Sequence, residues 1–182
     1  MANDALGGLL LALAREAIVC CFRDIPAVAG DDPRLATPGA TFVTLTQGGR
    51  LRGCIGSLDA WRPLADDVRE NAYAAAFSDP RFPPLAATEV HATHVEVSLL
   101  TPPEPIAFVD EADALRQLQP GVDGIVLECD GRRATFLPQV WEQLPEPERF
   151  LGQLKRKAGL PADYWNDALR LSRYRVDKWK EA

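Results

Sequence analysis

Histidine and closely spaced cysteines are scarce in this sequence, and their scarcity argues against a large group of metal sites. The 182 residues include two histidines and four cysteines. No Cys-x-x-Cys pair occurs, and His91 and His94 lie far along the chain from any cysteine. A structural zinc site takes four such ligands at short spacings, so none is expected here. No secretion signal is evident, so we expect reduced thiols in a cytoplasmic protein.

Long apolar runs and an excess of basic charge are also missing. The apolar run from Leu9 to Ala14 ends at Arg15 and Glu16, well short of the about 20 residues that span a bilayer. The net charge of -6 argues against a general nucleic-acid or membrane-surface binder. The C-terminal third is locally basic, which fits either a solvated face or an anion-binding patch. Its basic residues are Lys155, Arg156, Lys157, Arg170, Arg173, Arg175, Lys178 and Lys180.

The pattern that remains predicts an α+β protein that forms one compact domain over residues 1–182. Apolar spacing predicts helices at 3–22, 63–77, 110–119, 138–144 and 147–158. Alternation between turn residues predicts strands at 41–46, 51–57, 91–101, 125–129, 132–137 and 169–176. Two hairpins are each followed by a helix that opens with proline. We therefore expect one mostly antiparallel sheet built from two similar units, with helices packed on it.

The segment Leu-Arg-Gly-Cys-Ile-Gly at 51–56 is the strongest chemical signal in the chain. Strand alternation predicts that Arg52 and Cys54 share one face of the sheet. A cation near a thiol favours the reactive thiolate, so Cys54 is the candidate catalytic residue. Gly53 and Gly56 have no side chains, so they leave room for a ligand or another backbone.

Three charged residues elsewhere are further candidates for this site. Asp79 and Arg81 lie in a proline-rich loop that fixes the backbone, and they form either a pinning ion pair or part of the site. Glu96 lies on a predicted strand and is a candidate for the side of the sheet that carries Cys54. The other cysteines are expected to be structural, with Cys20 and Cys21 as small core residues.

The central motif and its surroundings resemble the AMMECR domain family, and within it the prokaryotic AmmeMemoRadiSam type. The segments that carry the resemblance run in order over nearly the whole chain: 51–56, 79–85, 95–101, 121–125, 132–138 and 173–174. The resemblance implies one compact α+β unit, with a large and a small subdomain around a mostly antiparallel sheet.

The resemblance also implies partners. Prokaryotic members of the family are grouped with a Memo-like protein, which resembles extradiol dioxygenases, and with a radical S-adenosylmethionine enzyme. This grouping suggests a three-protein modification pathway. The chain itself has no iron–sulfur or S-adenosylmethionine motif, so the radical chemistry would belong to the partner and no cofactor is expected here.

Two main functions follow from these observations. In the first, Cys54 is an activated thiol or a substrate-contacting residue in a cleft on the central strand. The candidate binding residues are Arg52, Gly53, Gly56, Asp79, Arg81 and Glu96. In the alternative, the chain is a non-catalytic adaptor or small-molecule-binding domain, whose cleft holds a small metabolite or a protein segment. Nucleic-acid binding through the basic C-terminal third is a distant third hypothesis.

Overall fold

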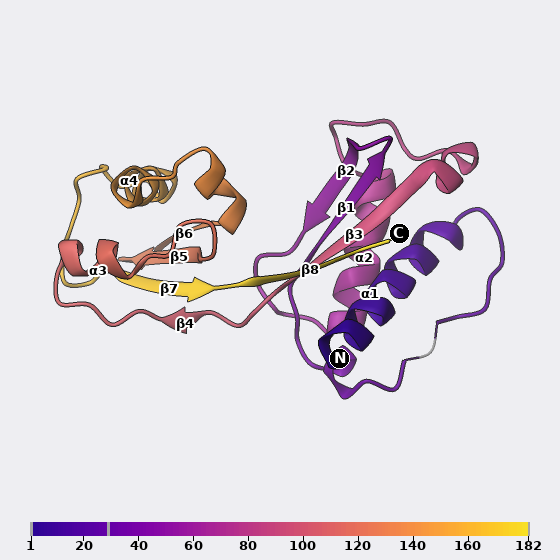
Figure 1. The fold of residues 1–182 in the computed structure, drawn as a ribbon, viewed down its shortest axis with the longest axis horizontal. Helices are drawn as coiled ribbons and strands as arrows, with labels where there is room; N and C mark the ends of the chain where they lie inside the picture. The colour runs from indigo at the N-terminus through magenta and orange to yellow at the C-terminus, as the bar shows by residue number, and fades with distance from the viewer. Residues whose placement is uncertain (1, 29, 182) are drawn as a thin grey trace. The chain divides into compact units, whose positions relative to one another are not determined.

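The computed structural model describes residues 2–28 and 30–181, which fold as two compact units. The first unit comprises Met1–Leu100 with Asp177–Ala182, and the second comprises Thr101–Val176. Figure 1 shows the last strand returning to the sheet of the first unit. The α+β class and the antiparallel pairing are therefore as the sequence predicts, and the division into a larger and a smaller part is as the family resemblance implies.

The first unit has one four-stranded sheet with two long helices. The strand order is β2-β1-β3-β8. The elements are α1 (Ala2–Val19), β1 (Thr41–Gln47), β2 (Arg50–Gly56), α2 (Leu64–Phe77), β3 (Thr93–Leu100) and β8 (Val176–Lys180), with short 3₁₀ helices at Pro33–Ala36 and Ala87–Ala92. Helix α2 packs on β1 and β2, and α1 packs on α2 and β3.

The second unit has its own four-stranded sheet, in the order β4-β7-β5-β6. The elements are β4 (Glu104–Pro105), α3 (Glu111–Gln117), β5 (Gly124–Cys129), β6 (Arg132–Phe136), a 3₁₀ helix at Pro138–Glu142, α4 (Pro147–Lys157) and β7 (Arg170–Tyr174). Helix α4 packs on β6 and α3 packs on α4. The expectation of a single sheet is therefore wrong: the two predicted hairpins are both present, but each belongs to a different sheet.

Local sequence explains why the hairpin of the central motif forms. Alternation places Val43 and Leu45 of β1 on one face, where both are fully buried. Gly48 and Gly49 take φ values of 53° and 76°, which lets the chain reverse within the tight turn. Helix α2 begins directly after Pro63, as its sequence predicts.

One sequence expectation about the first unit is wrong, and one of its strands was not predicted. Cys20 and Cys21 are exposed, because α1 ends at Val19 and both cysteines lie in the turn that follows. Strand β8 was not predicted, because its polar composition gives no apolar alternation. The Trp179 ring of β8 occupies the space that a side chain at Gly7 of α1 would need, so this edge strand packs closely against α1.

No helix among the described residues is both long and apolar enough to cross a membrane.

Candidate functional site

Cys54 lies on the face of the first sheet that points away from the two helices. Thr44 of β1 is paired with Cys54 on one side and with Glu96 of β3 on the other. Cross-strand partners share a face, and the neighbours of Thr44, which are Val43 and Leu45, point into the helix-covered core. We call the face of Cys54, Thr44 and Glu96 the outer face.

The outer face brings a thiol and a carboxylate onto one surface without contact between them. The Thr44 hydroxyl donates a hydrogen bond to the Cys54 sulfur at 3.4 Å. One strand separates Cys54 from Glu96, so their backbones are about 10 Å apart. All three side chains are partly exposed. The expectation that Glu96 shares the side of the sheet with Cys54 is confirmed by the strand register.

At the edge of the sheet, the side chains of Asp79 and Arg81 make the backbone hydrogen bonds that a neighbouring strand would otherwise make. Strand β2 is an edge strand, so the backbone groups of Cys54 that face outward have no strand partner. The Cys54 N–H donates to Asp79 Oδ2 at 2.9 Å, and Arg81 Nη2 donates to the Cys54 carbonyl at 3.1 Å. Arg81 also donates to both oxygens of Asp79, at 2.9 Å and 2.7 Å. The loop ion pair therefore fixes the backbone of Cys54 directly.

Electrostatics ties the same two residues to the thiol. The hydrogen bond from the Arg81 side chain, together with the Cys54 N–H, holds the pKa of buried Asp79 well below its usual range. The side-chain hydrogen bond to Asp79 in turn raises the pKa of Arg81, and the charge interaction with Cys54 acts in the same direction. The Arg81 side chain remains 53% exposed, so it is also open to a ligand.

Arg52 is not on the outer face, contrary to the prediction. A β-bulge interrupts the register: Leu45 is opposite Gly53 and Thr46 is opposite Leu51, so Arg52 has no partner. The Arg52 guanidinium is instead paired with Glu89 through hydrogen bonds of 2.9 Å and 3.0 Å.

The partners of Glu89 show which side of the sheet Arg52 occupies. Glu89 also accepts a hydrogen bond from Gln47, and Gln47 shares the helix-covered face of β1 by alternation. The guanidinium beside Cys54 is therefore that of Arg81. The bulge is the physical reason that a simple period of two fails along this strand.

The two glycines of the motif do not open space for a ligand. A Cβ on Gly53 would stand 2.1 Å from the carbonyl oxygen of Ala75, because α2 packs directly against the strand. A Cβ on Gly56 would stand 2.3 Å from the ring of Phe42. The expected close approach of another backbone is therefore present at Gly53, but neighbouring groups fill both positions.

A buried polar network, which the sequence analysis missed, fixes both ends of the central hairpin. Asp67 of α2 is fully buried and accepts hydrogen bonds from the backbone and hydroxyl of Thr41, both at 2.7 Å. Its other oxygen accepts from Ser57 at 2.7 Å and Arg62 at 2.9 Å. Asn71 also donates to Asp67 at 2.9 Å. The i, i+4 spacing of these two polar residues on α2 is the sequence signal that could have indicated the network.

Several basic residues of the C-terminal third have structural partners. Lys155 is fully buried and paired with Glu111 at 2.5 Å. Lys157 donates to the Thr135 carbonyl at 2.9 Å, and Arg173 donates to the Gln117 carbonyl at 2.8 Å. These contacts favour the interpretation in which the basic residues stabilise the second unit.

Comparison with known proteins places these features in a family context. The AMMECR1 family model matches residues 11–179. A protein of Methanothermobacter thermautotrophicus is 42% identical over 142 residues, which cover 77% of this chain and 74% of that protein. A protein of Saccharolobus solfataricus is 37% identical, with 98% of this chain and 83% of that protein covered. The crystal structure of an uncharacterized protein from Pyrococcus horikoshii superposes with a TM-score of 0.76 and 34% identity, and it covers 96% of this chain and 91% of that one.

Proposed function

Because the chain belongs to the AMMECR1 family, we propose that it is one component of a three-protein modification pathway, in which Cys54 contacts the substrate. The other components are a Memo-like protein and a radical S-adenosylmethionine enzyme, as in the AmmeMemoRadiSam type that the motifs resemble. The four cysteines are free thiols, which supports a cytoplasmic location.

The observation that carries the role of Cys54 is its position beside Arg81 on the outer face. Asp79 fixes Arg81 by accepting hydrogen bonds at both carboxylate oxygens, and Arg81 donates to the Cys54 carbonyl at 3.1 Å. The exposed part of the guanidinium is then available to an anionic group of the substrate. Glu96 lies about 10 Å across the face. A small polar molecule spans that distance, so one substrate contacts the thiol at one end and the carboxylate at the other.

A second function, a non-catalytic binding domain, is favoured by the lack of a partner base at Cys54. The sulfur accepts its hydrogen bond from the Thr44 hydroxyl. The residues aligned with Cys54 across the described strands are Thr44 and Glu96, and neither is a histidine. Nucleophilic cysteines usually have an adjacent general base. In this alternative the same outer face binds a metabolite or a segment of a partner protein, and the chain does no chemistry itself.

An anaerobic reconstitution distinguishes these functions. The radical enzyme and the Memo-like protein of the same organism are incubated with S-adenosylmethionine, a reductant and a metabolite extract. Formation of 5′-deoxyadenosine is then measured by mass spectrometry. We expect the wild-type chain to increase the yield and Cys54→Ala to remove that increase. Cys129→Ala is the matched control, because it removes a thiol elsewhere, and we expect it to retain the increase.

The other outcomes decide between the two functions. An increase that Cys54→Ala retains would contradict a substrate-contacting thiol and support the binding domain. A yield that does not depend on the chain at all would overturn the proposed pathway.

A further inference from the structure

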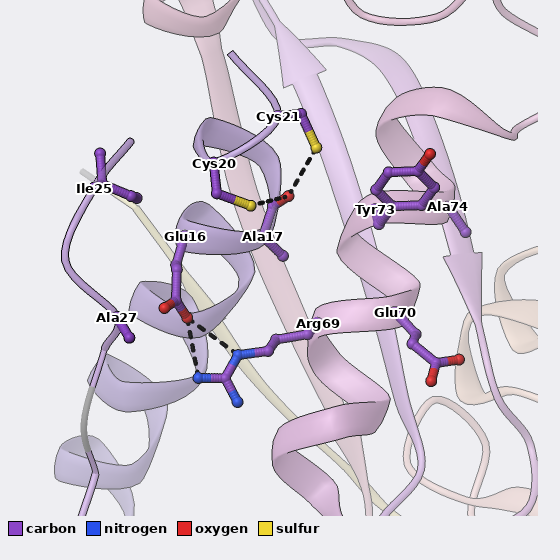
Figure 2. Close-up of a pocket in the computed structure, with 10 residues that line it drawn as sticks. All are labelled: Glu16, Ala17, Cys20, Cys21, Ile25, Ala27, Arg69, Glu70, Tyr73 and Ala74. Carbon is purple, nitrogen blue, oxygen red and sulfur yellow. Dashed lines mark hydrogen bonds and ion pairs between the residues drawn. The ribbon is translucent and has the colours of Figure 1, made fainter. Parts of the chain in front are cut away.

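A second cysteine site lies at the other side of the first unit, in a cavity between the end of α1 and α2. The cavity has a volume of about 700 Å³, which is in the range that holds a drug-sized ligand. Figure 2 shows Cys20 and Cys21 at one end and Tyr73 on the facing helix. The lining residues are Glu16, Ala17, Cys20, Cys21, Ile25, Ala27, Arg69, Glu70, Tyr73 and Ala74.

The two thiols converge although their residues are adjacent in sequence. In a continuous helix, neighbouring side chains diverge by about 100°. Here the chain tightens after Val19: Cys21 N donates to the Ile18 carbonyl, a bond across three residues. Both sulfurs then hydrogen-bond to the Ala17 carbonyl at 3.4 Å, as Figure 2 shows. The two sulfurs therefore lie on either side of one carbonyl oxygen.

Adjacent cysteines are poorly placed to form a disulfide. Their Cα atoms are about 3.8 Å apart across a trans peptide, which is less than the 4.4 Å lower limit of ordinary disulfides. A soft metal or metalloid centre bonds to both sulfurs without an S–S bond, so the same geometry suits it better. Thiolate sulfur is the protein ligand that such soft centres prefer.

The cavity walls add an apolar surface next to the thiols. Ile25, Ala27 and Ala74 contribute aliphatic groups, and Tyr73 contributes a ring that is 50% exposed. An ion pair between Glu16 and Arg69 at 3.0 Å joins the two helices at the rim. The helix that precedes the thiols is thereby joined to the helix that carries the ring.

We propose that Cys20 and Cys21 form a dithiol site for a soft, thiophilic metal or metalloid centre, and that the adjacent cavity holds an apolar substituent of that centre. With an aryl arsenoxide, two As–S bonds form, the As–O bond breaks, and the oxygen leaves as water with the two thiol protons. With a cuprous ion, two Cu–S bonds form and the protons go to solvent. Neither reaction changes an oxidation state.

Proton release gives cuprous binding a pH dependence, whereas arsenical binding carries both thiol protons away in water and releases none to solvent. Thiolate is the form of cysteine that binds a metal, so both thiols must lose their protons when the cuprous ion binds. We expect the affinity for the cuprous ion to increase as the pH rises.

Two probes and three variants test the proposal on the full chain. Phenylarsine oxide tests the dithiol together with the cavity, and the cuprous ion, in competition with a coloured chelator, tests the dithiol alone. Cys20→Ser and Cys21→Ser each leave one thiol at an exposed position. We expect one equivalent of either probe per wild-type chain and at least a tenfold loss of affinity in each variant. Tyr73→Ala should weaken phenylarsine oxide binding but leave cuprous binding unchanged.

A control variant and two contrary outcomes complete the design. Cys129→Ala also removes one thiol, and it should bind both probes as the wild type does. Wild-type affinity in either single serine variant would overturn the dithiol, because one sulfur would then suffice. Phenylarsine oxide binding that is unaffected by Tyr73→Ala would overturn the role of the cavity.

Discussion

Two hairpins of this chain each carry one cysteine, and the two thiols have opposite surroundings. Cys54 of the first unit is partly exposed on the outer face, where its sulfur accepts a hydrogen bond from the Thr44 hydroxyl and its carbonyl accepts one from the Arg81 guanidinium. Cys129 of the second unit is 2% exposed and lies beside the Asp130–Gly131 turn. Burial and then the negative charge of Asp130 raise the pKa of the Cys129 thiol.

In each hairpin, neighbouring loop residues set the surroundings of the cysteine. The proline-rich loop at β2 brings a cation to Cys54. At Cys129 the neighbouring groups are Asp130 and Asn166, which accept its hydrogen bond at 3.6 Å and 3.5 Å. These surroundings raise the pKa of the Cys129 thiol, and we expect Cys54, which has a guanidinium at its backbone, to be the more reactive of the two. The predictions below test each part of this contrast.

The largest effect is expected at the close contact between β2 and α2. Gly53→Ala would place a Cβ 2.1 Å from the Ala75 carbonyl oxygen. The new Cβ is attached to the β2 backbone and meets the α2 backbone, so neither side can move easily. We therefore expect the free energy of unfolding to fall by about 3 kcal/mol or more. Urea unfolding measures this change. The matched variant in the second hairpin is Ala134→Gly, which needs no such movement and should cost about 1 kcal/mol. Equal losses in the two hairpins would contradict the close packing at Gly53.

A smaller effect is expected from the carboxylate that fixes the edge of β2. Asp79→Asn weakens the bonds to the Cys54 N–H and to Arg81, which should cost about 1–3 kcal/mol. Asp130→Asn, at an exposed position in the other hairpin, should change stability by less than about 0.5 kcal/mol.

The Asp79 contribution also has a definite pH dependence. Its pKa is lowered in the folded state, so its stabilisation is complete above the unfolded value of about 3.9 and is lost as the pH falls below it. Acid unfolding of wild type and Asp79→Asn should therefore converge. A constant difference down to low pH would argue against the Arg81 pair.

The smallest effect is expected at the ion pair of Arg52. The Arg52 guanidinium, together with the Ala86 N–H, lowers the pKa of Glu89 to about 2. The stabilisation is therefore present above the unfolded pKa of about 4.3 and is lost as the pH falls towards about 2. Glu89→Gln should be less stable than wild type at neutral pH, with a difference that shrinks in this window.

Glu128→Gln is the matched control in the second hairpin. Its partner Arg133 is 3.4 Å away, and both side chains are exposed, so we expect almost no loss of stability at any pH. If the two glutamine variants behave alike in thermal unfolding across pH, Glu89 has no special pairing with Arg52.

Much of this fold could be predicted from sequence because its signals are local. Proline before α2, the glycine turn of the first hairpin and the Asp130–Gly131 turn all act within a few residues. Asp110 caps α3 as expected, because its side chain accepts from the Asp113 N–H. Glu96 lies on the side of the sheet for which alternation made it a candidate, whereas the register that aligns it with Thr44 and Cys54 comes from the structure.

The errors came from interactions that local patterns do not contain. The bulge at Arg52 depends on how β2 aligns with β1, so period-two reasoning placed this residue on the wrong face. The split into two sheets depends on long-range strand pairing, because β3 pairs with β1 in the first sheet and β7 pairs with β5 in the second. The contact of Arg81 with Cys54 spans 27 residues and was visible in the sequence only as an ion pair in a rigid loop.

The most direct test of the central claim is the rate at which each cysteine of the native protein reacts with iodoacetamide, measured peptide by peptide with mass spectrometry. We expect Cys54 to react at least about tenfold faster than Cys129, since one is partly exposed beside a cation and the other is buried among acceptors. Arg81→Ala should slow Cys54 by about threefold or more, whereas Arg52→Ala should leave its rate unchanged. A Cys54 as slow as Cys129, or one that responds to Arg52 and not to Arg81, would contradict the account.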